Sequence, residues 1–216
     1  GVHFGHKTSR WHPKMAPYIH SKRQETHIID LVKTAEGLEA ALPFITKTVA
    51  SGKKVLFVGT KKQHKEIVKA AAESAGMPYV TERWVGGMLT NVATMGTQIK
   101  KLHDLEKRMA SGDLEKRYNK LEVQRFQEEI DVLNSKYDGI KNLEGQPGAV
   151  IVVDTINDAG AIREARNLKV PVVGVVDTNA DPTLVDYVIP GNDDAIKGTQ
   201  LLLDYFVAAV KEWAVK

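Results

Sequence analysis

Short apolar runs alternate with helix-length segments along most of this chain. Three of the runs are almost continuously apolar, which is typical of strands that are buried on both faces of a sheet. These buried strands are expected at 54–59 (KVLFVG), 149–154 (AVIVVD) and 170–177 (VPVVGVVD). Shorter runs predict further strands at 27–31, 79–81 and 187–189.

The segments between the runs have the length and composition of helices. They predict helices over about 34–50, 61–75, 159–168 and 194–213. Thr34 is placed to cap the first helix, and Gly76 is placed to end the second. Buried strands that alternate with helices form right-handed βαβ units. The pattern therefore predicts an α/β protein, a three-layer α/β/α sandwich around a mostly parallel sheet.

A long insertion, residues 90–141, interrupts this alternation with a different apolar period. Its second half has a seam with spacings of four and three: Phe126, Ile130, Leu133, Tyr137 and Ile140. Its first half has a rougher stripe: Val92, Met95, Ile99, Leu102 and Leu105. Residues 111–113 (SGD) lie between them as a turn signal. We expect an antiparallel coiled-coil hairpin arm, inserted into a globular domain made of residues 1–89 and 142–216.

Composition excludes several classes of protein. The chain has no Cys, which removes disulfides, thiol catalysis and cysteine-based zinc sites and fits a reducing cytoplasm. No apolar run approaches the roughly 20 residues of a membrane-spanning helix. The start of the sequence has no apolar stretch like that of a signal peptide. We therefore expect no membrane partner.

Formal charge is uneven along the chain. Residues 1–24 contain five Lys or Arg and no Asp or Glu, with three aromatic residues among them. Residues 53–69 contain six Lys and one Glu. Residues 154–194 contain eight acids and only three bases, Arg163, Arg166 and Lys169. This asymmetry predicts one face for a polyanion, and an acidic region that faces a protein partner because phosphate would repel it.

The basic, aromatic-containing first segment suits RNA, because cations meet phosphates and flat rings meet bases. Composition alone leaves open the alternative of a solvated loop whose aromatic residues pack on the domain. The candidate RNA contacts in this segment are Lys7, Arg10, Trp11, His12, Lys14, Lys22 and Arg23.

The turn after the second predicted strand, Gly59 to Lys62, has neither a dinucleotide fingerprint nor a P-loop. Its helix start, with Lys61, Lys62 and Lys65, suits a single phosphate, which an RNA backbone can supply. The alternative is an ordinary helix start with solvated lysines.

The string at 82–91, ERWVGGMLTN, combines adjacent glycines with a tryptophan. We interpret Trp84 and Met88 as packing the root of the arm while Gly86 and Gly87 turn the chain. Arg83 remains a candidate phosphate contact.

Acids gather near the ends of the late strands: Asp154, Asp177, Asp181, Asp193 and Asp194. Ligands of open α/β sheets favour this edge, and grouped carboxylates suit Mg²⁺. Asp177, Asp181, Asp193 and Asp194 are therefore candidate metal ligands, although helix capping and turn formation explain such acids equally well. The alternative function is a nucleotide- or metal-dependent α/β enzyme that uses the Gly59–Lys62 turn and the Asp177, Asp193 and Asp194 edge.

Four strings together resemble one family over essentially the whole chain. They are GVHFGHKTSRWHPKMAPYI at 1–19, HIIDLVKT at 27–34, ERWVGGMLTN at 82–91 and VDTNADPTLVDYVIPGNDDAI at 177–196. The sequence is similar to the small-subunit ribosomal protein S-two family, and the helical insertion resembles its bacterial or organellar branch.

The resemblance implies a flavodoxin-like sheet with a coiled-coil arm, and a non-catalytic, cytoplasmic constituent of the ribosome. It implies binding to small-subunit rRNA, contacts with other small-subunit proteins and the docking of ribosomal protein S-one. The basic motif of the family maps onto His3 through Lys14, and its glycine-tryptophan motif onto Arg83 through Asn91. The resemblance also suggests that Phe4 is a buried anchor.

Overall fold

The computed structural model, which describes residues 1–214, is built on a five-stranded, entirely parallel sheet. Its strands are β4 (Val55–Val58), β5 (Tyr79–Val80), β6 (Ala149–Val152), β7 (Val172–Val176) and β8 (Tyr187–Pro190). Their order across the sheet is β5-β4-β6-β7-β8, so the direction of winding reverses between β4 and β6. This is the doubly wound order of flavodoxin-like sheets. The predicted fold class is confirmed.

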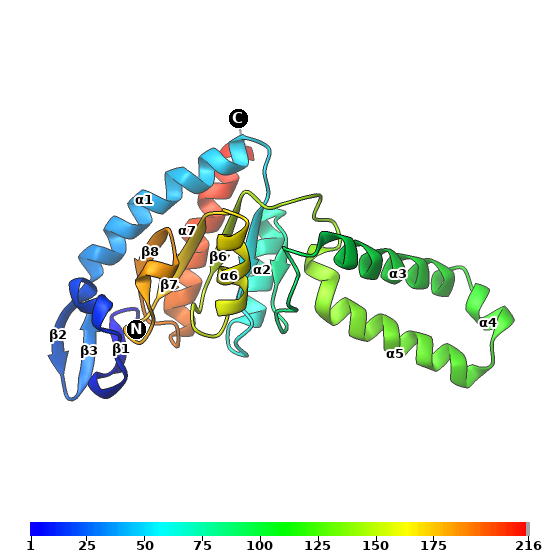
Figure 1. Cartoon of the computed structure of the whole chain (residues 1–216), viewed down its shortest axis with the longest axis horizontal. Coiled ribbons are helices and arrows are strands. Elements are labelled where there is room, and N and C mark those ends of the chain that lie inside the picture. Colours follow the sequence, from blue (N-terminus) through cyan, green and yellow to red (C-terminus); the bar gives the residue numbers. More distant parts are fainter. Residues whose placement is uncertain (215–216) are drawn as a thin grey trace.

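Two layers of helix cover the sheet (Figure 1). One face packs against α1 (Leu31–Ala50), α2 (Lys65–Ala75) and α7 (Ile196–Ala214). The other face packs against α6 (Ala159–Asn167) and the root of the insertion. Successive residues of a strand pack against opposite helix layers. Phe57 faces the α1 side and Val58 faces the α6 side, and both are fully buried. The strands therefore read as continuous apolar runs in the sequence.

The predicted strand at 27–31 is not part of this sheet. It is β3 (Thr26–Ile29), the central strand of a separate antiparallel sheet with β1 (Phe4–Lys7) and β2 (Ile19–Arg23). We call residues 4–29 the N-terminal sheet; it also contains the short helices η1 (Thr8–Arg10) and η2 (Pro13–Tyr18). A two-residue turn, Gln24 and Glu25 with φ of 45° and 62°, joins β2 to β3. An apolar run carries no information about its pairing partner, which explains the error.

Two helix starts differ from the prediction. Asp30, not Thr34, caps α1, because its Oδ1 accepts a hydrogen bond from the Val32 N–H at 2.9 Å. Thr34 is buried instead, and its hydroxyl donates to the Pro190 carbonyl oxygen at 2.7 Å. Helix α2 begins at Lys65 rather than at 61, because residues 61–64 form a turn. Gly76 does end α2, with φ of 63°.

One helix crosses the sheet edge so closely that it needs a glycine. Gly37 of α1 lies on β8, where a Cβ atom would come within 2.3 Å of the Val188 carbonyl oxygen. Any side chain at this position would push α1 away from the sheet.

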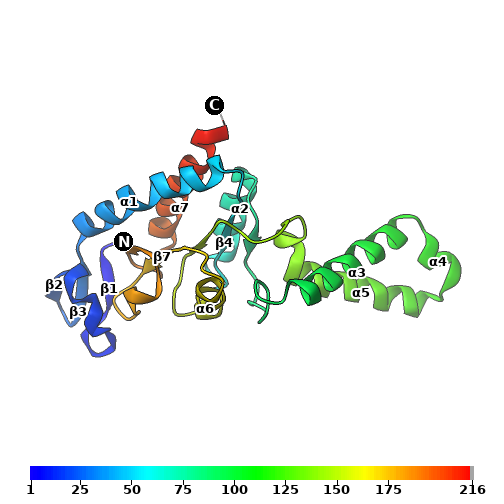
Figure 2. The same ribbon diagram turned by 45° about the horizontal axis from the view of Figure 1, so that its top comes forward.

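The insertion forms two long helices that run side by side and project away from the sheet (Figures 1 and 2). They are α3 (Val92–Ala110) and α5 (Lys120–Tyr137), joined at the tip by α4 (Asp113–Arg117). We call residues 92–137 the arm. In both views it extends on the side opposite the N-terminal sheet.

The seam of the arm is mostly as predicted. Its buried residues are Met95, Leu102, Leu105, Ile130, Leu133 and Tyr137. Val92, in the first turn of α3, is 63% exposed and does not join the seam. The sequence pattern missed α4, which buries Leu114 completely at the tip. Coiled-coil packing stays a prediction, as do the exact domain limits, and residues 215–216 lie outside the described part of the chain.

Candidate nucleic-acid interface

The N-terminal sheet is fixed to the carboxyl end of β7 by backbone contacts around Thr178. The backbone N–H of His6 donates to Thr178 Oγ1 at 2.8 Å, and that of His12 donates to the Thr178 carbonyl oxygen at 2.7 Å. Gly5 lies directly on this threonine, where a Cβ atom would come within 2.5 Å of Thr178 Cγ2. The first segment is therefore a docked element and not a solvated loop.

A buried carboxylate holds the same strand by charge. His6 Nδ1 lies 3.2 Å from Oδ2 of Asp177, whose side chain is fully buried. Asp177 also accepts from the backbone N–H of Thr178 at 2.5 Å and from that of Asp193 at 3.3 Å. The hydrogen bond with Asp177 raises the pKa of His6 above its usual range, against the opposing effect of burial.

Lys61 occupies the centre of the acidic edge. Its Nζ lies 3.2 Å from Asp154, 3.2 Å from Asp193 and 2.7 Å from Asp194. Burial disfavours its charged form, yet these carboxylates hold the pKa of Lys61 above its ordinary value. Burial, together with the charges of Asp154 and Asp177, raises the pKa of Asp193 to about 7. Lys61 is thus an internal counter-ion for three carboxylates.

The crevice where the sheet reverses its winding is crossed by internal hydrogen bonds. Thr60 Oγ1 donates to Asp158 at 2.6 Å and accepts from Asn157 at 2.6 Å. Burial raises the pKa of Asp158 to about 6. In a nucleotide-binding sheet of this order, the ligand occupies that crevice. Here protein groups from the β4 and β6 ends contact one another across it.

Two more lysines that were predicted to contact RNA are paired within the chain. Lys14 Nζ lies 2.8 Å from Asp181 Oδ2 and donates to Thr183 Oγ1 at 3.0 Å. This lysine holds the pKa of Asp181 well below its usual range. Lys65 forms an ion pair with Glu82. Lys14, Lys61 and Lys65 therefore each have a carboxylate partner within the chain.

The candidate metal ligands have the same internal partners. Asp177 pairs with His6, Asp181 with Lys14, and Asp193 and Asp194 with Lys61. Within residues 1–214 no three His, Asp or Glu side chains converge in a group that suits a metal ion. The side chains of His6, Lys14 and Lys61 therefore lie beside these carboxylates, where a metal ion would otherwise bind.

The expectation that the acidic region faces a protein partner is wrong for half of its acids. Four of its eight acids are buried: Asp154, Asp158, Asp177 and Asp193. Each lies at the carboxyl end of a strand or in the turn that follows it, where it binds backbone N–H groups, hydroxyls or cations. Sequence reasoning missed this because burial cannot be read from a sum of charges.

Six of the cations that we predicted to contact RNA are exposed. Within residues 1–214, no carboxylate oxygen lies within 4 Å of their charged nitrogen atoms. The six cations are Lys7, Arg10, Lys22, Arg23, Lys62 and Arg83. The first four belong to the N-terminal sheet and its turns. Exposed guanidinium and ammonium groups of this kind bind phosphate oxygens. They form the candidate nucleic-acid interface.

Aromatic residues accompany these cations. Trp11 is 39% exposed, and its ring centroid lies 5.2 Å from that of His27, so one part of the indole packs on the sheet while another faces solvent. His12 is half-buried, and its Nδ1 accepts from the Lys14 backbone N–H at 3.3 Å. Phe4 is 50% exposed, so the suggestion that it is a buried anchor is wrong.

The glycine-tryptophan string is held by a residue that sequence reasoning did not single out. Glu164 of α6 accepts from Trp84 Nε1 at 3.1 Å and from the backbone N–H groups of Gly87 and Leu89 at 2.7 and 3.0 Å. Although burial opposes it, this set of donors lowers the pKa of Glu164. Trp84 packs on the α6-side core and Met88 is buried, which confirms their interpretation as the root of the arm.

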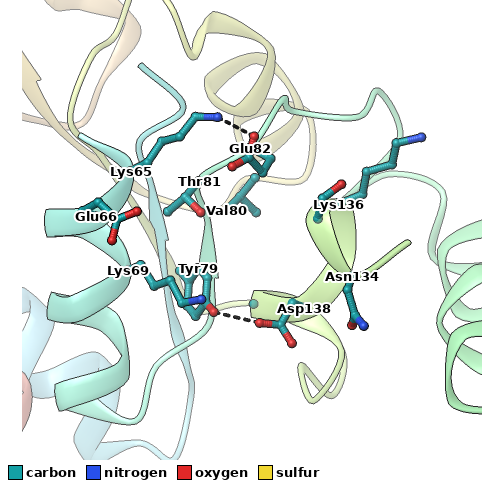
Figure 3. Close-up of a pocket in the computed structure, with 12 residues that line it drawn as sticks. Lys65, Glu66, Lys69, Tyr79, Val80, Thr81, Glu82, Asn134, Lys136 and Asp138 are labelled. Carbon is teal, nitrogen blue, oxygen red and sulfur yellow. Dashed lines mark hydrogen bonds and ion pairs between the residues drawn. The ribbon is translucent and has the colours of Figure 1, made fainter. Parts of the chain in front are cut away.

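A cleft separates α2 from the base of α5 and has a volume of about 160 Å³ (Figure 3). The Lys65–Glu82 ion pair spans its upper part, and Tyr79 reaches across its lower part to donate to Asp138 at 3.0 Å. Burial and the hydrogen bond with Asp138 raise the pKa of Tyr79 above its usual range. The Tyr79–Asp138 hydrogen bond ties the end of α5 to the sheet domain.

Comparisons with known proteins identify the family of this chain. Residues 1–212 match the family model described as ribosomal protein S2, the S-two family. The chain belongs to the ribosomal protein S2 family. It is a protein of the small ribosomal subunit, works in the cytoplasm within the ribosome and is not an enzyme.

Several relatives in this family carry the name small ribosomal subunit protein uS2. The relative from Roseiflexus sp. (strain RS-1) is 51% identical over 202 residues, which are 94% of this chain and 77% of that protein. The relative from Thermus thermophilus is 50% identical over 203 residues, 94% of this chain and 79% of that protein. The relative from Chloroflexus aggregans is 49% identical over 212 residues, 98% of this chain and 89% of that protein.

Membership of the ribosomal protein S2 family gives the exposed cations a context, because this protein works in a particle built on RNA. Within residues 1–214, none of the helices combines the length and apolar character needed to span a bilayer.

Proposed function

We propose that this ribosomal protein binds small-subunit rRNA with the exposed face of its N-terminal sheet. The proposal rests on the difference between paired and unpaired cations in residues 1–24. Lys14 is paired with Asp181, whereas Lys7, Arg10, Lys22 and Arg23 are exposed and have no carboxylate partner within residues 1–214. Four solvated cations on a rigid, docked sheet bind a phosphate backbone without an ordering cost for the segment.

Lys62 and Arg83 extend this surface along the carboxyl edge of the sheet. Both are exposed, and they follow β4 and β5, the strands nearest the arm. Trp11 presents part of its ring beside the cations and stacks on an exposed base where the RNA offers one. Phosphate contacts position the protein, and the shape of the folded RNA supplies the selectivity.

Salt dependence of RNA binding tests this proposal. A variant with Lys7, Arg10, Lys22 and Arg23 all changed to Gln is compared with a control in which Lys47, Lys53, Lys54 and Lys211 are changed to Gln. The control residues are exposed and have no carboxylate partner in the described chain. Each lost phosphate contact reduces the slope of log K against log salt by about 1. We expect a slope smaller by roughly 3–4 for the first variant and an unchanged slope for the control; equal slopes would overturn the proposal.

The docking of ribosomal protein S-one and of other small-subunit proteins is proposed on a separate surface. Helix α7 exposes Leu201 and Tyr205, which are 50% and 47% exposed and one helical turn apart. An apolar pair on the face away from α6 suits a protein better than a phosphate backbone. Pull-down of purified S-one by ribosomal particles that carry Leu201→Ser and Tyr205→Ser should be weakened; unchanged recovery would remove this surface from the proposal.

A further inference from the structure

Helix α6 presents a row of cations that none of the contacts described so far uses. Arg163 and Arg166 lie on the helix, and Lys169 follows its last turn. All three are exposed, and no carboxylate among residues 1–214 forms an ion pair with them. Arg163 and Arg166 are three residues apart and are therefore neighbours on the surface of α6. Lys169 follows the end of the helix with φ of 57° and lines the same groove as Arg166.

The stretch that contains this row is acidic only in its formal charge. Its buried acids bind backbone groups and cations inside the protein, and Asp194 pairs with Lys61. Glu164, the acid on α6 itself, points to the loop at 84–90 and accepts five hydrogen bonds there. The outward side of α6 is therefore basic, although residues 154–194 have an excess of acids.

Thr183 links the α6 row to the N-terminal segment, because it accepts hydrogen bonds from both. Arg166 Nη1 donates to the Thr183 carbonyl oxygen at 2.9 Å, and Lys14 Nζ donates to the hydroxyl of the same threonine at 3.0 Å. Figure 1 shows α6 in front of the main sheet, between the N-terminal sheet and the arm. Helix α6 and the N-terminal segment therefore meet at the 182–184 turn.

A shallow groove of about 300 Å³ lies beside the row, lined by Arg166, Lys169, Leu184 and Asp186 among others. Asp186 is the exposed acid of this groove, and its Oδ2 accepts from the Val172 N–H at 2.8 Å. The groove therefore has a net positive charge, from Arg166 and Lys169 against the single carboxylate of Asp186.

We propose that the α6 row, Arg163, Arg166 and Lys169, is a second RNA-binding surface of this protein. It rests on the proposed function and extends the RNA face from the N-terminal sheet across α6 toward the arm. The ligand is the phosphate backbone of RNA, because three exposed cations without a carboxylate partner match its charge and carry no base-specific geometry. A protein with an acidic face is the competing occupant.

The test uses a variant with Arg163, Arg166 and Lys169 changed to Gln, and a control with Lys47, Lys53 and Lys211 changed to Gln. Both lose three exposed cations, so their net charges stay equal. Binding of each variant protein to protein-free small-subunit rRNA is measured from 50 to 200 mM salt. We expect the slope of log K against log salt to fall by about 3 for the α6 variant and to stay constant for the control.

A second variant, Arg163→Gln with Lys169→Gln, keeps the Arg166–Thr183 contact and guards against a local change of fold. Its slope should fall by about 2. Equal slopes for these variants and the control would overturn the inference, as would crosslinks from position 163 to a ribosomal protein with none to RNA. If the N-terminal variant loses affinity and the α6 variants do not, only the inference fails. If none of them loses affinity, the proposed function fails as well.

Discussion

Residues 1–24 and residues 154–194 have opposite formal charges, and the fold brings them together. The basic segment lies on the carboxyl ends of the late strands, where the acids are. Some charged side chains of each segment pair with side chains of the other, and the rest are exposed to solvent. Lys14 is used internally and Lys22 is not; Asp177 is buried, while Arg163, from the acidic segment, is exposed.

The net charge of a segment and the charge of the surface that it forms are therefore different quantities. A buried carboxylate with a partner adds to stability or to positioning and contributes little to the field that a ligand meets. Exposed cations without a partner decide where a polyanion binds. Paired and unpaired charges of the same type should therefore behave differently.

The largest effect is expected at Lys61. Its replacement by Gln leaves Asp154 and Asp193, both buried, without their cation. Breaking such an arrangement costs about 3–5 kcal/mol when fully buried, and because the Lys61 side chain is 27% exposed we expect about 2–4 kcal/mol. Urea unfolding measures the loss. Lys62→Gln, the neighbouring exposed lysine, is the control and should change stability by less than about 0.5 kcal/mol.

Asp177→Asn should release the N-terminal sheet while the main sheet stays folded. The change removes the charge that faces His6 and weakens an acceptor of the Thr178 N–H. A buried hydrogen-bonding group that loses its partner costs about 1–3 kcal/mol. Hydrogen exchange should become faster in residues 4–29 and stay constant in β6 and in the arm. Uniform acceleration over the whole chain would show that the acid supports the core instead.

Stability should fall between pH 6.5 and pH 8.5. The raised pKa of His6 means that its contribution is full below 6.5 and is lost as pH rises through the folded-state value. Asp193, with a pKa of about 7, acts in the same direction, because its ionisation in a buried site is unfavourable. Burial lowers the pKa values of His64 and His27, so these two groups act in the opposite direction near pH 6.5. Urea midpoints at the two pH values measure the change, and His6→Gln should reduce it; an identical change in that variant would contradict the role of His6.

The smallest expected effect is a difference in the salt dependence of RNA binding between variants of two lysines, Lys22 and Lys14. Lys22→Gln should reduce the salt slope of RNA binding by about 1, because an exposed cation is lost. Lys14→Gln should leave the slope almost unchanged, because Asp181 already holds that lysine at 2.8 Å. A slope loss of the same size in both variants would show that internal pairing does not withdraw a cation from RNA.

The sequence predicted the elements well where one periodic pattern is enough. The strands at 55–58, 149–152 and 172–176 and the seam of the arm are local signals, and they appear in the structure. The pairing of β3 with β1 and β2, and the short helix α4, depend on tertiary contacts that no local run records.

The site was harder to predict, for a similar reason. Lys61 meets Asp193 across 132 residues of chain, and Lys14 meets Asp181 across 167. A sum over neighbouring residues counts these charges as surface charges. It also counts Arg163 and Lys169 as minor members of an acidic segment, although they are exposed and unpaired in the described chain.

The most direct measurement is a structure of this protein within its small ribosomal subunit, with RNA phosphates counted around each cation. We predict phosphate oxygens within 4 Å of most of Lys7, Arg10, Lys22, Arg23, Arg163, Arg166 and Lys169. We predict none that close to Lys61. Phosphates gathered instead on the α1 and α7 side, with the N-terminal sheet and α6 facing solvent or protein, would contradict the account.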